Sequence, residues 1–272
     1  MKKKIFNSLG LMSGTSMDGV DLSIIKSNGI DEVQLLYDEY FEFEDNLRNE
    51  LLDLRDNLSK SDDLKKYSKK IKDTEKKFTL FNGKIVNKVI NKTGLQIDLI
   101  GFHGQTILHL AREKISEQLG DGNLLSLILK CLVVNKFRQN DLDNNGQGAP
   151  LTPIFHNLIS KKLNESSNLK YPIDIINIGG ITNVTQIIND GHVEQNTFAY
   201  DVAPGNCLID EWLRKNNSKK YDKNGDIANL GRVDDLIFNQ AIENFEITSI
   251  KESLDVKDFD LSFVKGLTLE DG

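Results

Sequence analysis

The sequence contains only two cysteines, Cys131 and Cys207, among its 272 residues. Two thiols so far apart, with no secretory segment, are typical of reduced cytoplasmic residues and not of a disulfide framework. The basic start, MKKK, is not followed by the apolar stretch of a signal peptide. No apolar run reaches the roughly 18 residues that a membrane-spanning helix needs. We therefore expect a cytoplasmic protein with no membrane partner.

An excess of positive charge is also missing. The chain has 34 basic and 41 acidic residues, which gives a formal net charge of −7. This balance argues against nucleic acid or an anionic membrane as the main partner. An anionic ligand would need local backbone and cation contacts. The length is comfortable for two domains, each with its own core.

Two familiar phosphate-binding motifs are absent, and so is any regular metal-ligand spacing. The chain has neither G-x-x-x-x-G-K-[ST] nor G-x-G-x-x-G. It has instead the stretch MSGTSMDGVD, residues 12–21, between the apolar segments 4–12 and 19–27, which we predict to be paired strands. Glycine lets the backbone approach an anion and point several N–H groups at it. The loop is therefore a candidate phosphate site, with an ordinary hairpin as the alternative.

The same order of elements recurs later in the chain. Residues 173–188 again predict a strand, a glycine turn at Gly179 and Gly180, and a strand. The polar segment 140–150 separates the two halves. We therefore predict two tandem domains of like design, residues 1–145 and 146–272, with a nucleotide's phosphates held in the cleft between them.

Periodicity and composition predict the remaining elements. A third strand is expected over 33–43, and leucines at spacings of four, three and four indicate a helix over 45–58. Further helices are expected over 64–89 and 153–163. Strands are expected over 97–102, 127–134 and 197–202.

A few polar residues lie where these strands end. Asp201 precedes Pro-Gly-Asn and a helix, which suits a carboxylate aimed at a cleft beside a helix N-terminus that could bind an anion. Its alternative is a turn aspartate. His103 and Gln105 follow a buried strand and could contact a sugar, although a lone histidine is more often structural. Arg138 could hold a carboxylate or phosphate, or form a surface ion pair.

Several motifs, in order, resemble the anhydro-N-acetylmuramic acid kinases. They are GLMSGTSMDGVD, GFHGQTILH, QLGDGN, GQGAPLTPIFH, NIGGITNVT, YDVAPGNCLIDEW, YDKNGDIA and SLDVKDFD. The resemblance covers essentially the whole chain. It implies the α/β fold of actin-like ATPases, with two ribonuclease-H-like domains, and membership of the sugar kinase, Hsp70 and actin superfamily.

The resemblance also implies a reaction. ATP phosphorylates O6 of 1,6-anhydro-N-acetylmuramic acid while water opens the anhydro bridge, giving N-acetylmuramic acid 6-phosphate in peptidoglycan recycling. The family's base matches Asp201, and His103, Gln105 and Arg138 become candidate sugar contacts. Mg²⁺ is expected with ATP, held by Asp18 through water, and a homodimer is expected. The family's ATP loop matches Gly14, Thr15, Ser16, Met17, Asp18, Gly19, Val20 and Asp21.

The chain departs from the family pattern at several positions. Val202 and Ala203 replace Thr and Gly after the base, Lys136 replaces Asp, and Asn144 and Asn145 replace a glycine pair. Family members also run on by roughly a hundred residues, so the second domain is expected to be incomplete. Two alternatives stay open: a truncated relative that binds sugar without turning it over, and another sugar kinase of the same fold.

Overall fold

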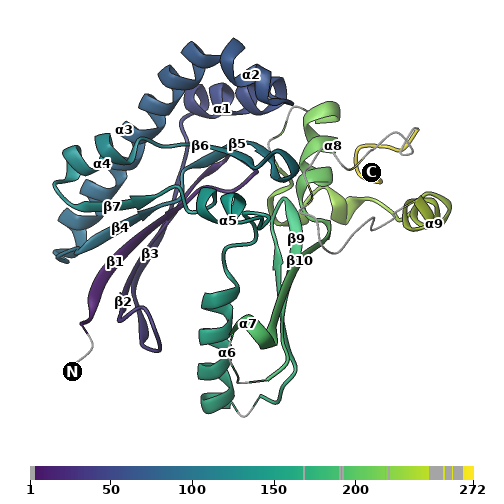
Figure 1. Ribbon diagram of the computed structural model, residues 1–272. Helices are drawn as coiled ribbons and strands as arrows, with labels where there is room; N and C mark the ends of the chain where they lie inside the picture. Colours follow the sequence, from purple (N-terminus) through teal and green to yellow (C-terminus); the bar gives the residue numbers. More distant parts are fainter. Residues whose placement is uncertain are drawn as a thin grey trace. The chain divides into compact units, whose positions relative to one another are not determined.

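The computed structural model describes residues 4–167, 169–189, 191, 193–217, 219, 221–244, 254, 259 and 266–272. The chain divides into two compact units, Met1–Leu151 and Thr152–Gly272, and each is described by itself (Figure 1). Within the described residues, no helix is both long and apolar enough to cross a bilayer.

The first unit is built on a five-stranded mixed sheet. Its order is β3-β2-β1-β4-β7, with β1, β2 and β3 antiparallel and β1, β4 and β7 parallel. The strands are β1 (Phe6–Met12), β2 (Gly19–Ser27), β3 (Val33–Glu42), β4 (Leu99–Phe102) and β7 (Leu132–Asn135). The predicted pair 4–12 and 19–27 and the third strand are confirmed.

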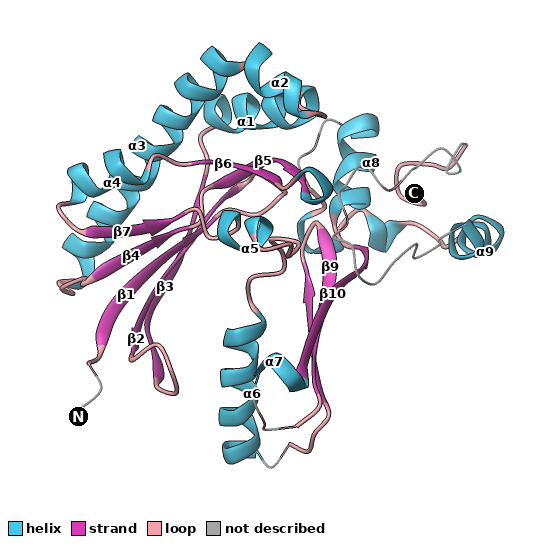
Figure 2. Ribbon diagram, in the orientation of Figure 1, coloured by secondary structure: helices cyan, strands magenta, loops and turns pink. Residues whose placement is uncertain are grey.

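Helices cover one face of this sheet (Figure 2). They are α1 (Asp45–Asn57), α2 (Ser61–Lys66), α3 (Ser68–Thr93) and α4 (Gly122–Leu129). The short helix α5 (Gln139–Asp143) and a 3-10 turn, η1 (Ala111–Glu113), contact β6 (Ile115–Leu119) instead. The predicted leucine stripe of α1 is buried, and it joins Phe78 of α3 and Phe102 of β4 in one core. A hairpin, β5 (Gln105–Leu110) and β6 (Ile115–Leu119), follows β4 directly. The β4–β5 turn thus lies at the carboxyl end of a central strand.

Two predictions for this unit were wrong in detail. The single helix over 64–89 is two helices, because Tyr67 leaves helical geometry at φ −98° and ψ 10°. The apolar run 127–134 is the end of α4 followed by β7. Lys130 ends that helix in the left-handed region, at φ 51°. A short apolar run does not by its periodicity distinguish a strand from a buried helix.

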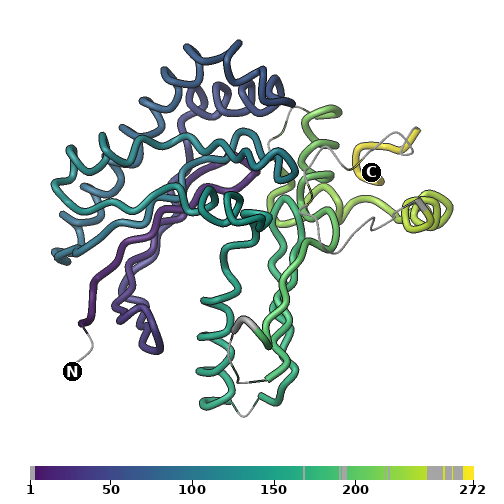
Figure 3. The backbone as a smooth tube through the Cα atoms, in the orientation of Figure 1, coloured from purple at the N-terminus to yellow at the C-terminus, as the bar shows by residue number. Residues whose placement is uncertain are grey.

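The second unit contains a three-stranded antiparallel sheet of order β10-β9-β8. Its strands are β8 (Ile173–Ile178), β9 (Ile181–Ile187) and β10 (Thr197–Pro204). Its helices are α6 (Pro153–Ser167), α7 (Val193–Asn196), α8 (Cys207–Asn217) and α9 (Asp235–Asn244), with 3-10 turns η2 (Lys223–Gly225) and η3 (Ala228–Leu230). Helix α6 packs along β9 and β10 (Figure 3). The predicted strand, glycine turn and strand over 173–188 are confirmed, and the meander repeats the order of β1, β2 and β3.

Candidate active site

Ser13 anchors the glycine loop between β1 and β2 from its buried side. This side chain is 3% exposed, and its Oγ lies 2.9 Å from the carbonyl oxygen of Gly19 and 2.5 Å from Oε1 of Gln105. Both neighbours accept, so the one hydroxyl proton points between them. Ser13 thereby ties the two ends of the loop to each other and to the β4–β5 turn. Sequence reasoning missed this residue, although it lies inside the quoted motif.

Met17 and Asp18 fix the far side of the loop. Met17 adopts φ 53°, its side chain is fully buried, and its N–H donates to the Gly14 carbonyl at 3.2 Å. The backbone carbonyl of Asp18 accepts from the N–H of Phe43 at 2.8 Å. The Ser16 hydroxyl donates to Oδ1 of Asp18 at 2.8 Å. The loop therefore has a defined shape and is not an open-ended connection.

The two loop glycines have different surroundings. A Cβ on Gly19 would lie 2.4 Å from the Phe41 carbonyl oxygen and 2.6 Å from the Tyr40 ring, so packing requires glycine there. A Cβ on Gly14 would meet nothing closer than 3.8 Å, which is the Ser16 hydroxyl. The fold does not need a glycine at position 14. The open space beside its Cα suits the close approach of a ligand to the backbone.

His103, which is buried, and Arg138, which is half-buried, form a polar cluster at the ends of β4 and β7. His103 Nδ1 lies 2.7 Å from the Gly104 carbonyl oxygen, so Nδ1 carries the proton and Nε2 accepts from Arg138, 2.9 Å from Nη2. Arg138 Nη1 also donates to the Gly148 carbonyl at 2.8 Å. Burial, helped by the guanidinium charge, lowers the pKa of His103 to about 4. The histidine is therefore neutral and orients the arginine.

Gln105 was expected to contact sugar, but its side chain has no exposed surface. Its Nε2 donates to the Gly14 carbonyl at 3.0 Å and more weakly to Thr106 at 3.4 Å, while Oε1 faces Ser13. No polar atom of this amide reaches a ligand in the described conformation. Gln105 joins the β4–β5 turn to the glycine loop.

The second glycine turn is tied to helix α8. The Gly179 carbonyl accepts from the N–H of Asn206 at 2.7 Å, and the Gly180 carbonyl accepts from Gly205 at 2.9 Å and Cys207 at 3.3 Å. A Cβ on Gly205 would lie 2.1 Å from the Gly179 oxygen, so that position requires glycine. The N–H groups of residues 205–207, which we expected to be available to an anion, are used by the turn itself.

Asp201 lies on β10 immediately before an irregularity in the strand. It pairs with Asn183, and Ala203 pairs with Thr182, so Val202 is the extra residue of a bulge. Bulges commonly aim side chains next to active sites. Oδ2 of Asp201 accepts from the N–H of Leu254 at 2.8 Å. Of the SLDVKDFD motif, only Leu254 and Phe259 lie within the described residues.

Two carboxylates lie close to the first loop. Partial burial and the neighbouring Asp18 charge raise the pKa of Asp21. Such a pair would gain from a bound cation, and a hard cation such as Mg²⁺ is bound through one or two carboxylates and several waters. In the part of the chain that the structure describes, no group of three or more histidine, cysteine, aspartate or glutamate side chains could hold a metal.

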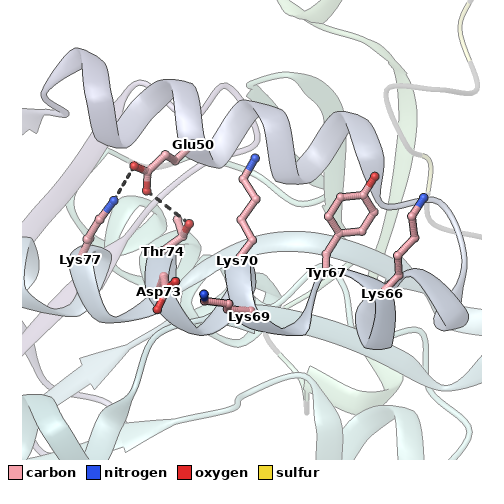
Figure 4. Close-up of a pocket in the computed structure, with 8 residues that line it drawn as sticks. All are labelled: Glu50, Lys66, Tyr67, Lys69, Lys70, Asp73, Thr74 and Lys77. Carbon is pink, nitrogen blue, oxygen red and sulfur yellow. Dashed lines mark hydrogen bonds and ion pairs between the residues drawn. The ribbon is translucent and has the colours of Figure 1, made fainter.

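A groove of the first unit lies elsewhere, between α1 and α3 (Figure 4). It is an open cavity of about 410 Å³, lined by Glu50, Lys66, Tyr67, Lys69, Lys70, Asp73, Thr74 and Lys77. Lys77 pairs with Glu50 and Lys70 with Asp53. None of the expected site residues lines it. Its lysines belong to the solvated faces of α2 and α3, so we do not place the active site there.

At two of the positions that depart from the family pattern, the backbone adopts a positive φ. Asn145, which stands where the family has glycine, adopts φ 69°, and asparagine tolerates this left-handed conformation better than most residues. Lys136 also adopts a positive φ, 58°. The turn on either side of Arg138 therefore keeps left-handed positions without glycine.

Comparison with known proteins agrees with these motifs. The family model described as anhydro-N-acetylmuramic acid kinase matches residues 6–263. A protein of that name from Pelagibacter ubique is 52% identical over 272 residues, covering 99% of this chain and 71% of the relative. One from Brucella canis is 35% identical, covering 97% and 70%, and one from Agrobacterium fabrum is 34% identical, covering 94% and 68%. The chain belongs to the anhydro-N-acetylmuramic acid kinase family.

Proposed function

We propose that this protein uses ATP and water to convert 1,6-anhydro-N-acetylmuramic acid into N-acetylmuramic acid 6-phosphate, a step in peptidoglycan recycling. Family membership supports the kinase class and the sugar named by the relatives. The observation that carries the proposal is a glycine loop whose backbone is anchored on one side and open beside Gly14 on the other.

Asp201 is the proposed general base. Its carboxylate takes a proton from water as the water oxygen attacks C1 of the sugar and the C1–O6 bond breaks. The freed O6 attacks the γ-phosphorus of ATP, the bond to the β-phosphate oxygen breaks, and ADP leaves. A base at the proton's position contributes about 10²–10⁴-fold to such a step. The bulge at Val202 supports the assignment because it re-aims the end of β10.

The residues 14–21 and the turn Gly179-Gly180 are the proposed phosphate contacts. In a trans peptide the C=O and N–H groups point in opposite directions. The Gly179 carbonyl points at the N–H of Asn206, the residue just before α8, so the N–H of Gly180 points away from that helix. An outward N–H of this kind can donate to a phosphate oxygen. Asp18, with water between, is proposed to hold Mg²⁺, which would neutralise phosphate charge when bound.

Arg138 is the proposed sugar contact. N-acetylmuramic acid carries a carboxylate, and a guanidinium presents a rigid fork of donors that matches it. His103 supports this role by fixing the arginine from the buried side, and Gln105 acts through the glycine loop. We also propose the actin-like fold, which the sheet order of the first unit and the repeated meander of the second support. A homodimer and a cytoplasmic location are proposed from the family alone.

A product assay tests the function. The protein is incubated with ATP and the anhydro sugar in ¹⁸O-labelled water, and the product is analysed by mass spectrometry. The proposal expects a sugar 6-phosphate with one ¹⁸O, carried at C1. Phosphorylation of a non-anhydro sugar in preference would instead favour another sugar kinase. Calorimetric binding of the anhydro sugar without binding of an ATP analogue would favour a relative that binds sugar only.

A further inference from the structure

We propose that Ser13 and Gln105 form a buried positioning pair that turns the Gly14–Thr15 peptide toward the nucleotide, so that Gln105 determines ATP affinity without contacting ATP. The inference rests on the proposed function for the identity of the ligand. It concerns two side chains with 3% and 0% exposure that are 92 positions apart in the sequence. Neither is a catalytic residue, because neither reaches solvent.

The first step is the direction of one carbonyl group. Gln105 Nε2 donates to the Gly14 carbonyl oxygen at 3.0 Å, and the Met17 N–H donates to the same oxygen at 3.2 Å. Both donors hold this oxygen toward the inside of the unit. Because a trans peptide places its N–H opposite its C=O, the N–H of Thr15 points the other way. That is the direction required of a backbone donor to a phosphate.

The second step is the orientation of the amide itself. Ser13 Oγ lies 2.5 Å from Oε1 of Gln105, and Oγ is the only donor there. This contact places Oε1 toward Ser13 and therefore Nε2 toward Gly14. With the amide reversed, two acceptor oxygens would face each other at Gly14, which a buried site does not tolerate. Ser13 thus sets which end of Gln105 meets the loop.

The third step is the space left on the outer side. A Cβ on Gly14 would have no neighbour within 3.8 Å, whereas Gly19 at the other end of the loop is closely packed. The loop is therefore closely packed at Gly19, whose carbonyl accepts from Ser13, and open beside Gly14, whose carbonyl accepts from Gln105. A ligand approaching Gly14 meets backbone, and its affinity depends on where the Thr15 N–H points.

Gln105→Leu is the informative variant. Leucine fills a similar volume but has no amide. Ser13 can still donate to the Gly19 carbonyl, and the Gly14 carbonyl can still accept from the Met17 N–H. The fold should therefore tolerate it. Thr79→Val is the matched control, because Thr79 is also fully buried and its hydroxyl also makes two hydrogen bonds, donating to the Glu75 carbonyl and accepting from the N–H of Asp121.

Three readouts separate positioning from general damage. For Gln105→Leu we expect the Kd of a non-hydrolysable ATP analogue and the KM of ATP to rise at least tenfold. The KM of the sugar should stay within twofold. Hydrogen exchange of the Met17 amide should quicken at least tenfold. In Thr79→Val all three should stay near the wild-type values, even if the melting temperature falls as far as in Gln105→Leu.

The double variant Ser13→Ala/Gln105→Leu completes the test. Ser13→Ala alone leaves Oε1 of Gln105 without its donor, so we expect it to weaken binding of the ATP analogue. We expect the double variant to bind the analogue no worse than Gln105→Leu does. Equal effects on ATP and sugar, an effect on sugar alone, or no effect on ATP would overturn the inference. Wild-type protein that binds the ATP analogue but phosphorylates no anhydro sugar would refute the proposed function while leaving this test intact.

Discussion

Arg138 donates to Nε2 of His103 from both Nε, at 3.2 Å, and Nη2, at 2.9 Å. An imidazole that accepts there and donates from Nδ1 to the Gly104 carbonyl uses both ring nitrogens. Protonation of Nε2 would remove the acceptor and place a second positive charge against the guanidinium. The neutral histidine is therefore part of what keeps the arginine in place, and this dependence is measurable.

The pH dependence of stability should report the pair. The pKa of His103 is about 4 in the folded protein, against 6.5 for an ordinary histidine. Between these values the unfolded chain binds more protons, so stability rises with pH, is complete above about 6.5 and is lost as pH falls toward 4. The loss should approach about 3 kcal/mol. Urea unfolding at several pH values should show it in the wild type.

The control for this prediction is His103→Gln, which keeps an acceptor for Arg138 but cannot titrate. Other groups, including His156, titrate in both proteins, so the difference between the two curves isolates His103. If the free energies of unfolding of the two proteins change in parallel from pH 7 to pH 4, protonation of His103 does not destabilise the fold, and the prediction is wrong.

The two glycines of the first loop should separate folding from binding. Gly19→Ala places a methyl group 2.4 Å from the Phe41 carbonyl and should lower the free energy of unfolding by about 1–3 kcal/mol. Gly14→Ala has room and should unfold like the wild type, but should weaken ATP binding because the methyl group occupies the approach to the backbone. Thermal melts and calorimetric titration with an ATP analogue decide both. Unchanged ATP affinity in Gly14→Ala would refute a phosphate site there.

Asp201→Asn should remove turnover without disturbing the strand. The amide oxygen can still accept from the N–H of Leu254, so the melting temperature should stay within about 2 °C. The carboxylate's basicity is lost, and kcat should fall by about 10²–10⁴-fold with little change in the KM of either substrate. Asp174→Asn, on an exposed position of β8, is the matched control and should keep full activity. Retained turnover in Asp201→Asn would end the assignment of the base.

The bulge after Asp201 offers a gain-of-function test. Val202→Thr with Ala203→Gly restores the hydroxyl and the flexible residue of the family pattern, and we expect kcat/KM to rise a few-fold. The added hydroxyl can bond phosphate or water, and glycine suits an irregular strand. Steady-state kinetics of the double variant measure this. Unchanged kinetics would mean that those two contacts are dispensable in this chain.

Local patterns predicted much of the fold, because strand alternation and the leucine spacing of α1 depend on neighbours in sequence. The break at Tyr67 and the end of α4 at Lys130 were missed, because each depends on how a helix terminates, which apolar periodicity does not report. The buried placement of Gln105 could not be predicted for a different reason. A polar residue after a strand can face a ligand or the interior, and the Ser13 hydroxyl that decides it lies 92 positions away.

The carbonyls of Gly14 and Gly179, one in each glycine turn, accept hydrogen bonds from different kinds of donor. The kind of donor determines whether a single mutation can change the orientation of the peptide. In the first turn the donors to Gly14 include a side chain, Gln105, so one codon change can retune it. In the second, the donor to Gly179 is the backbone N–H of Asn206, which every residue except proline supplies. The second turn is therefore robust to substitution at its donor. A single side-chain substitution can therefore change the setting of the first turn, whereas the second turn would need a proline at position 206.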